Sequence, residues 1–500
     1  MPPISLYWHD YETFGADPRL DRPVQFAGMR TDENLEIVGN PLEVYCRPTC
    51  DRLPSPDACL ITGITPQMAA DKGVPEAKFI AAIHQQLAWP GTCGLGYNTL
   101  RFDDEVTRHC LYRNFYDPYE REWKNGNSRW DLIDVVRLTA ALRPEGIEWP
   151  KDEQGRPSFR LERLTAANGI VHQGAHDALV DVRATIELAR LIRQRQPKLY
   201  DFLWRHRGKR EVAELLQLGS DQPVLHVSEK YSAERHCIAV VVALARHPVN
   251  QNGVIVYDLS SDPQPLLEID AEAIRERLFT PVAELPEGVA RIPLKTVHLN
   301  KCPVVVPLKT LRPQDAERLN IDLVRCNRHL QMLQDSVGIL EKLQQVFGTS
   351  PMESPEENDP ETMLYRGGFF SDADKREMAR VRESSPAALS QDEFRFDDRR
   401  LPELLFRYRA RSFPETLSLE EEQRWQNHCR RRMLAQEKDG RSHLEAYRAR
   451  LQELQLTQQL TDSRREILAS LETYGQEIVA ELALEDGNGF RVNPPAKASE

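Results

Sequence analysis

The first two hundred residues alternate extended and helical hydrophobic patterns. The apolar run at 4–8 predicts a strand that continues to Glu12, and 24–30 with 35–45 predicts a hairpin turning at 32–34. A further short strand is predicted at 92–97, and helices at 76–88, 103–115, 131–142, 159–168 and 177–193. Strands followed by helices that alternate with a strand indicate an α/β domain with a mixed sheet, which we place at 1–196.

The pattern changes over residues 197–348. Short runs rich in Val and Ile predict strands, with helices inserted near 271–278 and 315–347. The strands are predicted at 223–227, 237–245, 254–259, 291–299 and 302–306. This segment therefore predicts a small β-barrel-like domain with helical additions.

Beyond the barrel the chain loses its strand signals. Residues 349–363 hold three prolines and five acidic residues, which predicts a linker. Long helical patterns at 417–437 and 442–485 predict an all-α domain over 364–483, and the tail 484–500 is expected to be disordered.

Composition narrows the class of protein. The 500 residues suit about three domains, and no stretch approaches the ~20 apolar residues that would span a bilayer. No signal peptide is visible and the nine cysteines are scattered, so we expect reduced thiols and a cytoplasmic location. The net charge of −12 argues against nucleic-acid binding by the whole surface, although a local groove can still be basic.

Two carboxylates close the first predicted strand. Asp10 and Glu12 are two residues apart and therefore share one face of the strand. Such a pair arises often by chance in an acidic chain. On a central strand, however, the two groups would repel each other unless a cation compensated them.

Two further segments carry candidate chemistry at helix starts. Asp103 follows the strand at 92–97, where it is either a helix cap or a carboxylate facing a ligand. His176 and Asp181 open the last helix of the domain. They either complement the helix dipole or place a proton acceptor near a metal ion.

Taken together, in this order and spacing, these segments resemble the DEDD-family 3′–5′ exonucleases of the histidine subtype. Longer segments at 55–65, 96–119, 127–137, 142–150, 157–170 and 369–375 are similar to the bacterial exonuclease I family. The resemblance covers most of the chain. It implies an α/β ribonuclease H-like exonuclease domain, then a small SH3-like β-barrel domain with helical inserts, then an all-α C-terminal domain.

The resemblance also implies a reaction. Asp10, Glu12, Asp103 and Asp181 would bind two Mg²⁺ ions, with Mn²⁺ as a substitute, and His176 would be the general base. The expected activity is stepwise release of 5′-mononucleotides from the 3′ end of single-stranded DNA, in DNA repair and recombination.

Substrate contacts are sought where basic and aromatic residues alternate, because bases stack on aromatic faces. Candidate tracks are 193–210, with Tyr200, Phe202 and Trp204, and the arginines at 399, 400, 407, 409 and 411. The alternative for each track is solvated surface or core. The residues proposed to bind substrate are Glu12, Arg160, Arg108, Tyr119, Trp123 and Arg137, with Arg160 the first candidate for the terminal nucleotide.

The resemblance implies a protein partner as well, the acidic C-terminal tail of a single-stranded DNA-binding protein. Arg143 and Arg312, each between Leu and Pro, are candidates to bind its carboxylates. The chain is expected to act as a monomer without a membrane partner. An exonuclease acting on RNA, a proofreading exonuclease and an inactive single-strand-binding scaffold remain as alternatives.

Overall fold

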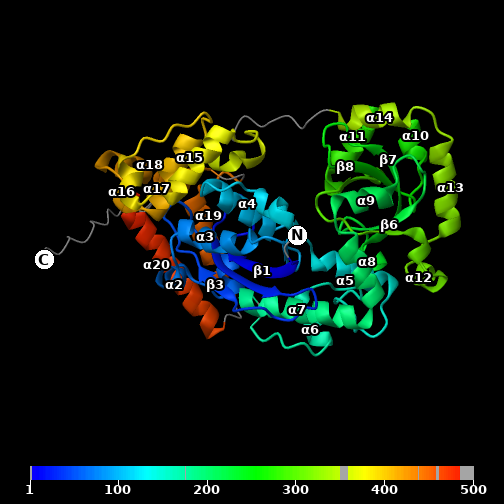
Figure 1. Cartoon of the computed structure of the whole chain (residues 1–500), viewed down its shortest axis with the longest axis horizontal. Helices are drawn as coiled ribbons and strands as arrows, with labels where there is room; N and C mark the ends of the chain where they lie inside the picture. The colour runs from blue at the N-terminus through cyan, green and yellow to red at the C-terminus, as the bar shows by residue number, and fades with distance from the viewer. Residues whose placement is uncertain (1–2, 175, 349–358, 437–438, 458–460, 485–500) are drawn as a thin grey trace.

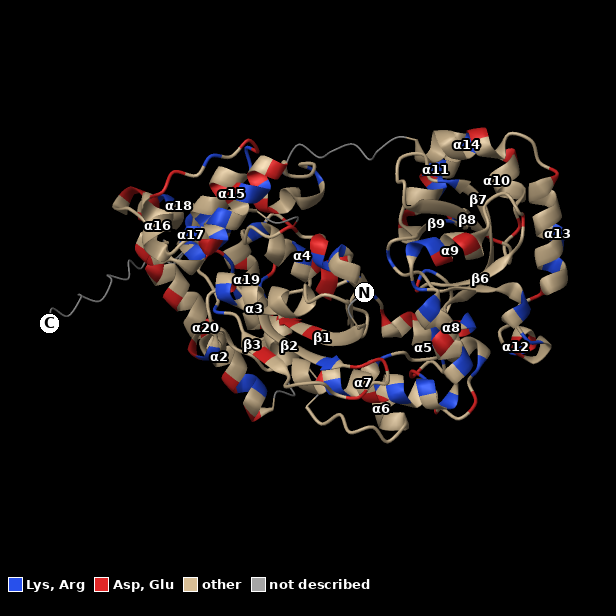
Figure 2. Cartoon of the chain, viewed as in Figure 1, with Lys and Arg blue, Asp and Glu red and all other residues tan. Residues whose placement is uncertain are grey.

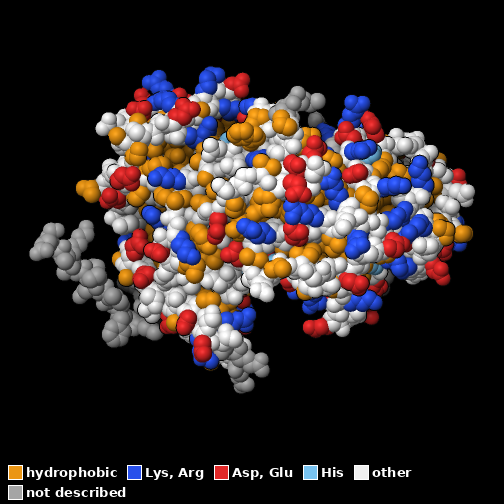
Figure 3. Space-filling model, turned by 60° about the horizontal axis from the view of Figure 1, so that its bottom comes forward, with side chains coloured by type: hydrophobic (Ala, Val, Ile, Leu, Met, Phe, Trp, Pro, Cys, Tyr) orange, Lys and Arg blue, Asp and Glu red, His pale blue; other side chains and the backbone are white. Residues whose placement is uncertain are grey.

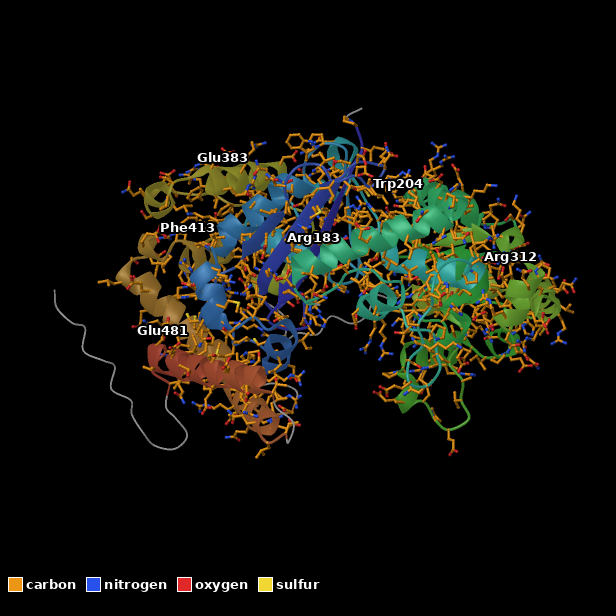
Figure 4. The ribbon with its side chains drawn as sticks, turned by 90° about the horizontal axis from the view of Figure 1, so that it is seen from below. Arg183, Trp204, Arg312, Glu383, Phe413 and Glu481 are labelled. Atoms are coloured by element: carbon orange, nitrogen blue, oxygen red, sulfur yellow. The ribbon has the colours of Figure 1, made fainter. Side chains whose placement is uncertain are left out.

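The computed structural model describes residues 3–174, 176–348, 359–436, 439–457 and 461–484. An α/β part from the first third of the chain lies in the middle (Figure 1). The β-barrel part lies on one side of it and the helical C-terminal part on the other. Seen from below, the two outer parts extend to the same side of the α/β part, so the chain has the shape of an arch (Figure 4).

The α/β part is built on a five-stranded mixed sheet in the order β3-β2-β1-β4-β5. β2 is antiparallel to both of its neighbours, β1 and β3, whereas β4 and β5 run parallel to the central β1. The strands are β1 Ser5–Thr13, β2 Pro23–Thr31, β3 Leu42–Tyr45, β4 Thr92–Leu95 and β5 Ser128–Arg129. The predicted hairpin is confirmed, although its second strand starts only at Leu42, after Leu35 adopts a left-handed φ of 69°.

Helices cover both faces of this sheet because β1 buries both of its faces. Leu6 and Trp8 pack beneath α5 Leu132–Leu142 and α7 Ala178–Arg195. Tyr7 and Tyr11 pack beneath α3 Glu76–Leu87 and α4 Asp103–Arg113. The short helix α6 is Leu161–Ala167. The ribonuclease H-like layering that we expected is therefore present.

Two short helices were not predicted, α1 Pro56–Thr62 and α2 Pro66–Lys72. Each begins with proline after a Ser or Thr whose side chain caps the helix. Proline at the first helical position behind such a cap is a sequence signal for a helix start. The helices were missed because each has only seven residues, too few for a clear helical pattern of apolar positions.

The barrel part contains a five-stranded antiparallel sheet in the order β10-β6-β7-β8-β9. Its strands are β6 Val224–Val227, β7 Ile238–Arg246, β8 Gly253–Asp258, β9 Leu294–His298 and β10 Val305–Pro307. The helices around it are α8 Pro197–Arg205, α9 Lys209–Leu216, α10 Gln264–Glu268, α11 Ala271–Phe279, α12 Pro313–Arg318, α13 Leu323–Gln334 and α14 Ile339–Phe347. The single helix predicted at 315–347 is wrong, because left-handed backbone at Asn320 and Gly338 divides it into three.

The C-terminal part is helical, as predicted. It consists of the 3₁₀ helix η6 Pro360–Tyr365 and of α15 Asp372–Glu383, α16 Pro386–Gln391, α17 Leu401–Ser412, α18 Leu419–Leu434, α19 His443–Gln455 and α20 Asp462–Glu481. The helix predicted at 442–485 is two helices, because Thr461 starts α20 by accepting a hydrogen bond from the Arg464 N–H. Nearly all of the predicted tail lies outside the described residues.

The end of the predicted linker is part of the fold. Residues 349–358 lie outside the described residues, but Glu361 in η6 is buried. Its carboxylate pairs with Arg22, at 3.3 Å, and with Arg411. Asp51 completes this cluster with distances of 2.8 Å to each of the two arginines. The charged cluster therefore joins the α/β part to the C-terminal part.

The hydrophobic cores are also shared between parts. One core combines Phe14, Val24 and Leu53 with Phe406 and Leu471 of the C-terminal helices. Another runs continuously from β1 into the strands of the barrel. All nine cysteines carry free thiols, and in the described ranges no helix is long and apolar enough to cross a bilayer.

Candidate active site

Four acidic residues gather at one edge of the first sheet. Asp10 and Glu12 project from β1 on the face covered by α7, and Asp181 lies in the first turn of that helix. Acidic residues, in red, can be seen on β1 in Figure 2. Asp103 begins α4, after β4 has run parallel to β1. Its Oδ1 accepts a hydrogen bond of 2.9 Å from the Tyr11 N–H, which places it beside the β1 pair.

The predicted histidine joins this group. Ligand atoms of Glu12, His176 and Asp181 all lie within 4.8 Å of one another. His176 has a left-handed φ of 71°, a conformation that non-glycine residues rarely adopt outside functional sites and turns. Its backbone N–H donates to Asp181 Oδ2 at 3.3 Å, while its side chain stays exposed.

Burial and mutual repulsion make this cluster electrostatically unfavourable by itself. Burial, together with the negative charges of Asp181 and Asp103, raises the pKa of Glu12 to about 9. Burial and the Asp103 carboxylate raise the pKa of Asp10 well above its usual range. A bound cation would remove this strain. A donor set of carboxylate oxygens with one imidazole fits a hard divalent cation.

A second histidine, which was not predicted, is also part of the site. His172 Nε2 lies 2.5 Å from Asp181 Oδ1, and its Nδ1 lies 2.9 Å from Thr165 Oγ1. Asp181 is thus bonded at one oxygen by His172 and at the other by the His176 backbone. No sequence signal pointed to His172, because the contact depends on how the loop before α7 folds.

Arg160 follows a residue that is bonded to the segment between β4 and Asp103. It precedes α6 and is exposed, and the neighbouring Phe159 carbonyl accepts a 2.5 Å hydrogen bond from Tyr97 Oη, just after β4. Glu12, the other candidate near the reacting end, is buried within the cluster. This position favours the substrate role predicted for Arg160.

Two of the arginines predicted to bind substrate form ion pairs with acidic residues of the chain instead. Arg108 is buried, with Glu122 and Glu105 each 2.7 Å away. Arg137 is also buried and pairs with Asp134 at 2.7 Å. Because both guanidinium groups are committed to these pairs, the structure does not favour a substrate role for either.

The two aromatic candidates lie away from the acidic edge. Trp123 is 64% exposed, but its loop borders the amino end of β4, where Gly91 N–H donates to the Asn125 carbonyl. Tyr119 packs on Phe369 with ring centroids 6.1 Å apart. Trp123 or Tyr119 could therefore contact only a long DNA substrate, at nucleotides far from its 3′ terminus.

The two predicted basic tracks differ in exposure. In the track 193–210 five of the seven basic residues are exposed, whereas the aromatic residues pack against the core. Tyr200 is buried, and Trp204 packs on buried Trp130 with centroids 5.2 Å apart beneath the Arg207 guanidinium. The C-terminal arginines 400, 407, 409 and 411 are buried in ion pairs. Charges of both signs are mixed over the face visible in Figure 3, without a basic stripe. The alternative that we kept open for these tracks, core and surface, fits the structure better.

The two candidate partner residues lie in one cluster. Arg312 Nε is 2.6 Å from Asp315, and Arg143 Nη1 approaches the same carboxylate at 3.7 Å. Arg318 is a third arginine beside it, at 3.3 Å. Each of the three side chains is about a third exposed, and Arg312 lies at the outer end of the barrel side (Figure 4).

Comparison with known proteins agrees with this architecture. Family models match residues 7–189 (Exonuclease), 207–349 (Exonuclease I SH3-like domain) and 358–478 (Exonuclease I C-terminal domain). Exodeoxyribonuclease I of Escherichia coli is 48% identical over 95% of this chain and 98% of its own length.

Two solved structures share the whole fold. Exonuclease I from Methylocaldum szegediense is 60% identical with a TM-score of 0.90, and E. coli exonuclease I in complex with a dA16 oligonucleotide is 47% identical with a TM-score of 0.91. Each match covers 95% of this chain and all of the other. With matches along all three of its parts, the chain belongs to the exodeoxyribonuclease I family and is an exodeoxyribonuclease.

Proposed function

We propose that this chain degrades single-stranded DNA from its 3′ end and releases 5′-mononucleotides, acting as a monomer in DNA repair and recombination in a bacterial cytoplasm. The observation that carries the proposal is the gathering of Asp10, Glu12, Asp103 and Asp181 with His176 at one sheet edge. The E. coli relative has been solved with a dA16 oligonucleotide, which supports single-stranded DNA as the substrate.

The four carboxylates would hold two Mg²⁺ ions, or Mn²⁺ in their place. Burial, and after it the neighbouring carboxylates, raise the pKa values of Asp10, Glu12 and Asp103, and bound cations would compensate the charges of these buried groups. When bound, the ions would make water a stronger nucleophile and stabilise charge on the scissile phosphate and the leaving oxygen.

His176 would accept the proton of the attacking water. Its side chain is exposed at the edge of the acidic cluster, where an entering water can reach it. The hydrogen bond from its backbone to Asp181 keeps the imidazole beside the carboxylates. A histidine is suited to this role because its ordinary pKa lies near neutral pH. Arg160 would hold the terminal nucleotide.

The decisive assay compares 3′-labelled and 5′-labelled single-stranded DNA with duplex DNA and RNA, each with Mg²⁺. We expect the label of 3′-labelled single-stranded DNA to be released as mononucleotide before the label of any other substrate. Preferential hydrolysis of RNA would favour the RNA-directed alternative, and no hydrolysis of any substrate would favour the inactive scaffold.

We further propose that the arginine cluster around Asp315 binds the acidic C-terminal tail of a single-stranded DNA-binding protein. Three arginines there face two carboxylates, buried Asp315 and Glu145, which lies 2.6 Å from Arg312, and this leaves positive charge for the carboxylates of a peptide. A solved complex described as SSB/Exonuclease I with an inhibitor is 46% identical to this chain, with a TM-score of 0.87.

Calorimetry with an acidic peptide ending in an apolar residue tests this partner. Arg143→Ala and Arg312→Ala should weaken binding, whereas Arg156→Ala, an exposed arginine paired with Asp152, should not. Unchanged affinity in both cluster variants would place the docking site elsewhere.

A further inference from the structure

A cavity of about 740 Å³ lies where the barrel meets the α/β part. The inner side of the barrel sheet supplies Lys295, and the segment before α4 supplies Leu100 and Arg101. Since Arg101 is two residues before Asp103, the cavity adjoins the segment that carries a candidate metal ligand. Its volume is in the range of sites for small organic ligands.

Lys295 is a half-buried lysine in the wall of this cavity. Its Nζ lies 2.6 Å from His226 Nε2, and His226 Nδ1 lies 2.9 Å from the Val304 carbonyl. Because that carbonyl only accepts, Nδ1 carries the ring proton and Nε2 accepts one from Lys295. Burial lowers the pKa of Lys295 to about 7. In the described part of the chain no carboxylate forms an ion pair with this ammonium group, which lies over the Tyr231 ring at 5.2 Å from its centroid. A charge removed from water without a carboxylate partner is unfavourable.

The charges around Lys295 leave room for an anion. Lys230 and Lys301 also line the cavity, and neither has an ion pair among the described residues. The lining acids Asp134 and Glu229 are already engaged by Arg101, at 3.8 and 2.5 Å. The other two lining acids, Asp131 and Asp258, accept backbone N–H groups.

Aromatic surface lies beside these cations. Phe279 lines the cavity and is 59% exposed, held edge-on by Phe347 with centroids 6.1 Å apart. The hydroxyl of Tyr231, another lining residue, is buried without a hydrogen-bond partner in the described part of the chain. Unpaired lysines next to an exposed aromatic ring are the combination that binds phosphate and base together.

We propose that this cavity is a nucleotide-binding site, with Lys295 and Lys230 on the phosphate and Phe279 against the base. The proposal rests on the proposed function, because hydrolysis supplies the nucleotide. Two sources share this chemistry, the released 5′-mononucleotide and the phosphodiester backbone of the strand being degraded.

Binding of dTMP and of a fluorescent oligothymidylate to the full chain, in EDTA, separates the two sources. The Asp10→Asn background prevents hydrolysis and keeps the acidic site from contributing a metal-bound nucleotide. We expect Lys295→Met, Lys230→Ala and Phe279→Ala each to weaken binding of the true ligand about tenfold or more. Lys309→Met, a change elsewhere in the barrel part, is the matched control.

Each outcome decides the proposal. Weaker dTMP binding assigns the cavity to the mononucleotide, and weaker oligonucleotide binding with no dTMP binding assigns it to the strand. Unchanged binding of both ligands in Lys230→Ala and Phe279→Ala, two changes at exposed positions, overturns it. Hydrolysis of a short oligonucleotide by the chain with Asp10 intact is measured separately, so a failure of the nuclease proposal is distinguished from a failure of this one.

Discussion

His172 Nε2 lies 2.5 Å from Asp181 Oδ1, and this contact links the loop before α7 to a candidate metal ligand. An ionised carboxylate only accepts, so Nε2 carries a proton and donates it to Asp181. Thr165 Oγ1, 2.9 Å from the other ring nitrogen, fixes the orientation of the ring. His172 is therefore a positioning residue that acts through Asp181.

Removing this contact should weaken metal binding. In proteins, loss of a group that orients a metal ligand lowers metal affinity about 10–100-fold. We therefore expect the Mg²⁺ concentration for half-maximal turnover to be about 10–100-fold higher in His172→Ala than in the wild type. The Mg²⁺ concentration that gives half of the Mg²⁺-induced rise in Tm should increase by the same factor. His172→Gln, whose amide can donate to Asp181, should recover part of the loss, and His247→Ala in the barrel should change neither titration. An unchanged Tm titration in His172→Ala would limit the residue to packing.

Removing one charge from the acidic cluster should separate activity from stability. Glu12→Gln deletes a proposed ligand and should abolish turnover while oligonucleotide binding persists. It also removes a carboxylate whose pKa is raised to about 9 by burial and its acidic neighbours. In EDTA at pH 8 we therefore expect Tm to rise, by about 1 °C for each kcal/mol of destabilisation relieved in a chain of 500 residues. Thermal melts beside Glu36→Gln, an exposed control, check this, and a lower Tm in Glu12→Gln would contradict it.

His176 should be needed for proton transfer. A general base contributes about 10²–10⁴-fold, so His176→Ala should lose activity within this range at pH 7. Part of the loss should return as pH rises, because hydroxide replaces the missing base. The pH profile of kcat is the measurement. A profile equal to the wild type in height and shape would leave His176 as a helix-start residue only.

The buried charged cluster between the α/β and C-terminal parts should make the stability of the protein fall at low pH. The arginines at 411 and 22 hold the pKa values of the Asp51 and Glu361 carboxyls well below their usual range. A lowered folded pKa stabilises the protein above the unfolded pKa values of about 3.9 and 4.3, and this stability is lost as pH falls below them.

The expected measurement is Tm against pH from 6 to 3. The wild type should decline steeply below about pH 4.5. Glu361→Gln should decline less steeply and should be less stable at pH 7, by about 3–5 kcal/mol, because it removes one of the two carboxylates that Arg22 and Arg411 share. Glu33→Gln, in an exposed turn, is the control. Parallel curves for Glu361→Gln and the wild type would show that the cluster does not govern acid sensitivity.

The apolar run at 4–8 was enough to predict the central strand, and the two-residue spacing of Asp10 and Glu12 was enough to predict their shared face. The position of Asp103 followed from the strand before it. His172 could not be predicted, because its role exists only once the loop folds back onto α7. Arg411 was misassigned to a substrate track, since its partner Asp51 is 360 residues away along the chain and sequence periodicity carries no information on such pairs. The predicted helix lengths were wrong where a single residue, such as Thr461, caps a new helix inside a continuous apolar pattern.

The hydrophobic core shared by the α/β and C-terminal parts also affects folding during synthesis. Gln67 in α2 donates a hydrogen bond to the carbonyl of Ser470 in α20, a residue 403 positions later. A ribosome that adds about 5–20 residues per second needs about 20–80 s to synthesise the chain between them. Throughout that interval the apolar surface around Phe14, Leu53 and Cys59 has no C-terminal helices to cover it. The nascent α/β part is therefore a substrate for chaperones until synthesis is nearly complete, and a stop codon late in the gene would damage a catalytic part encoded at its beginning.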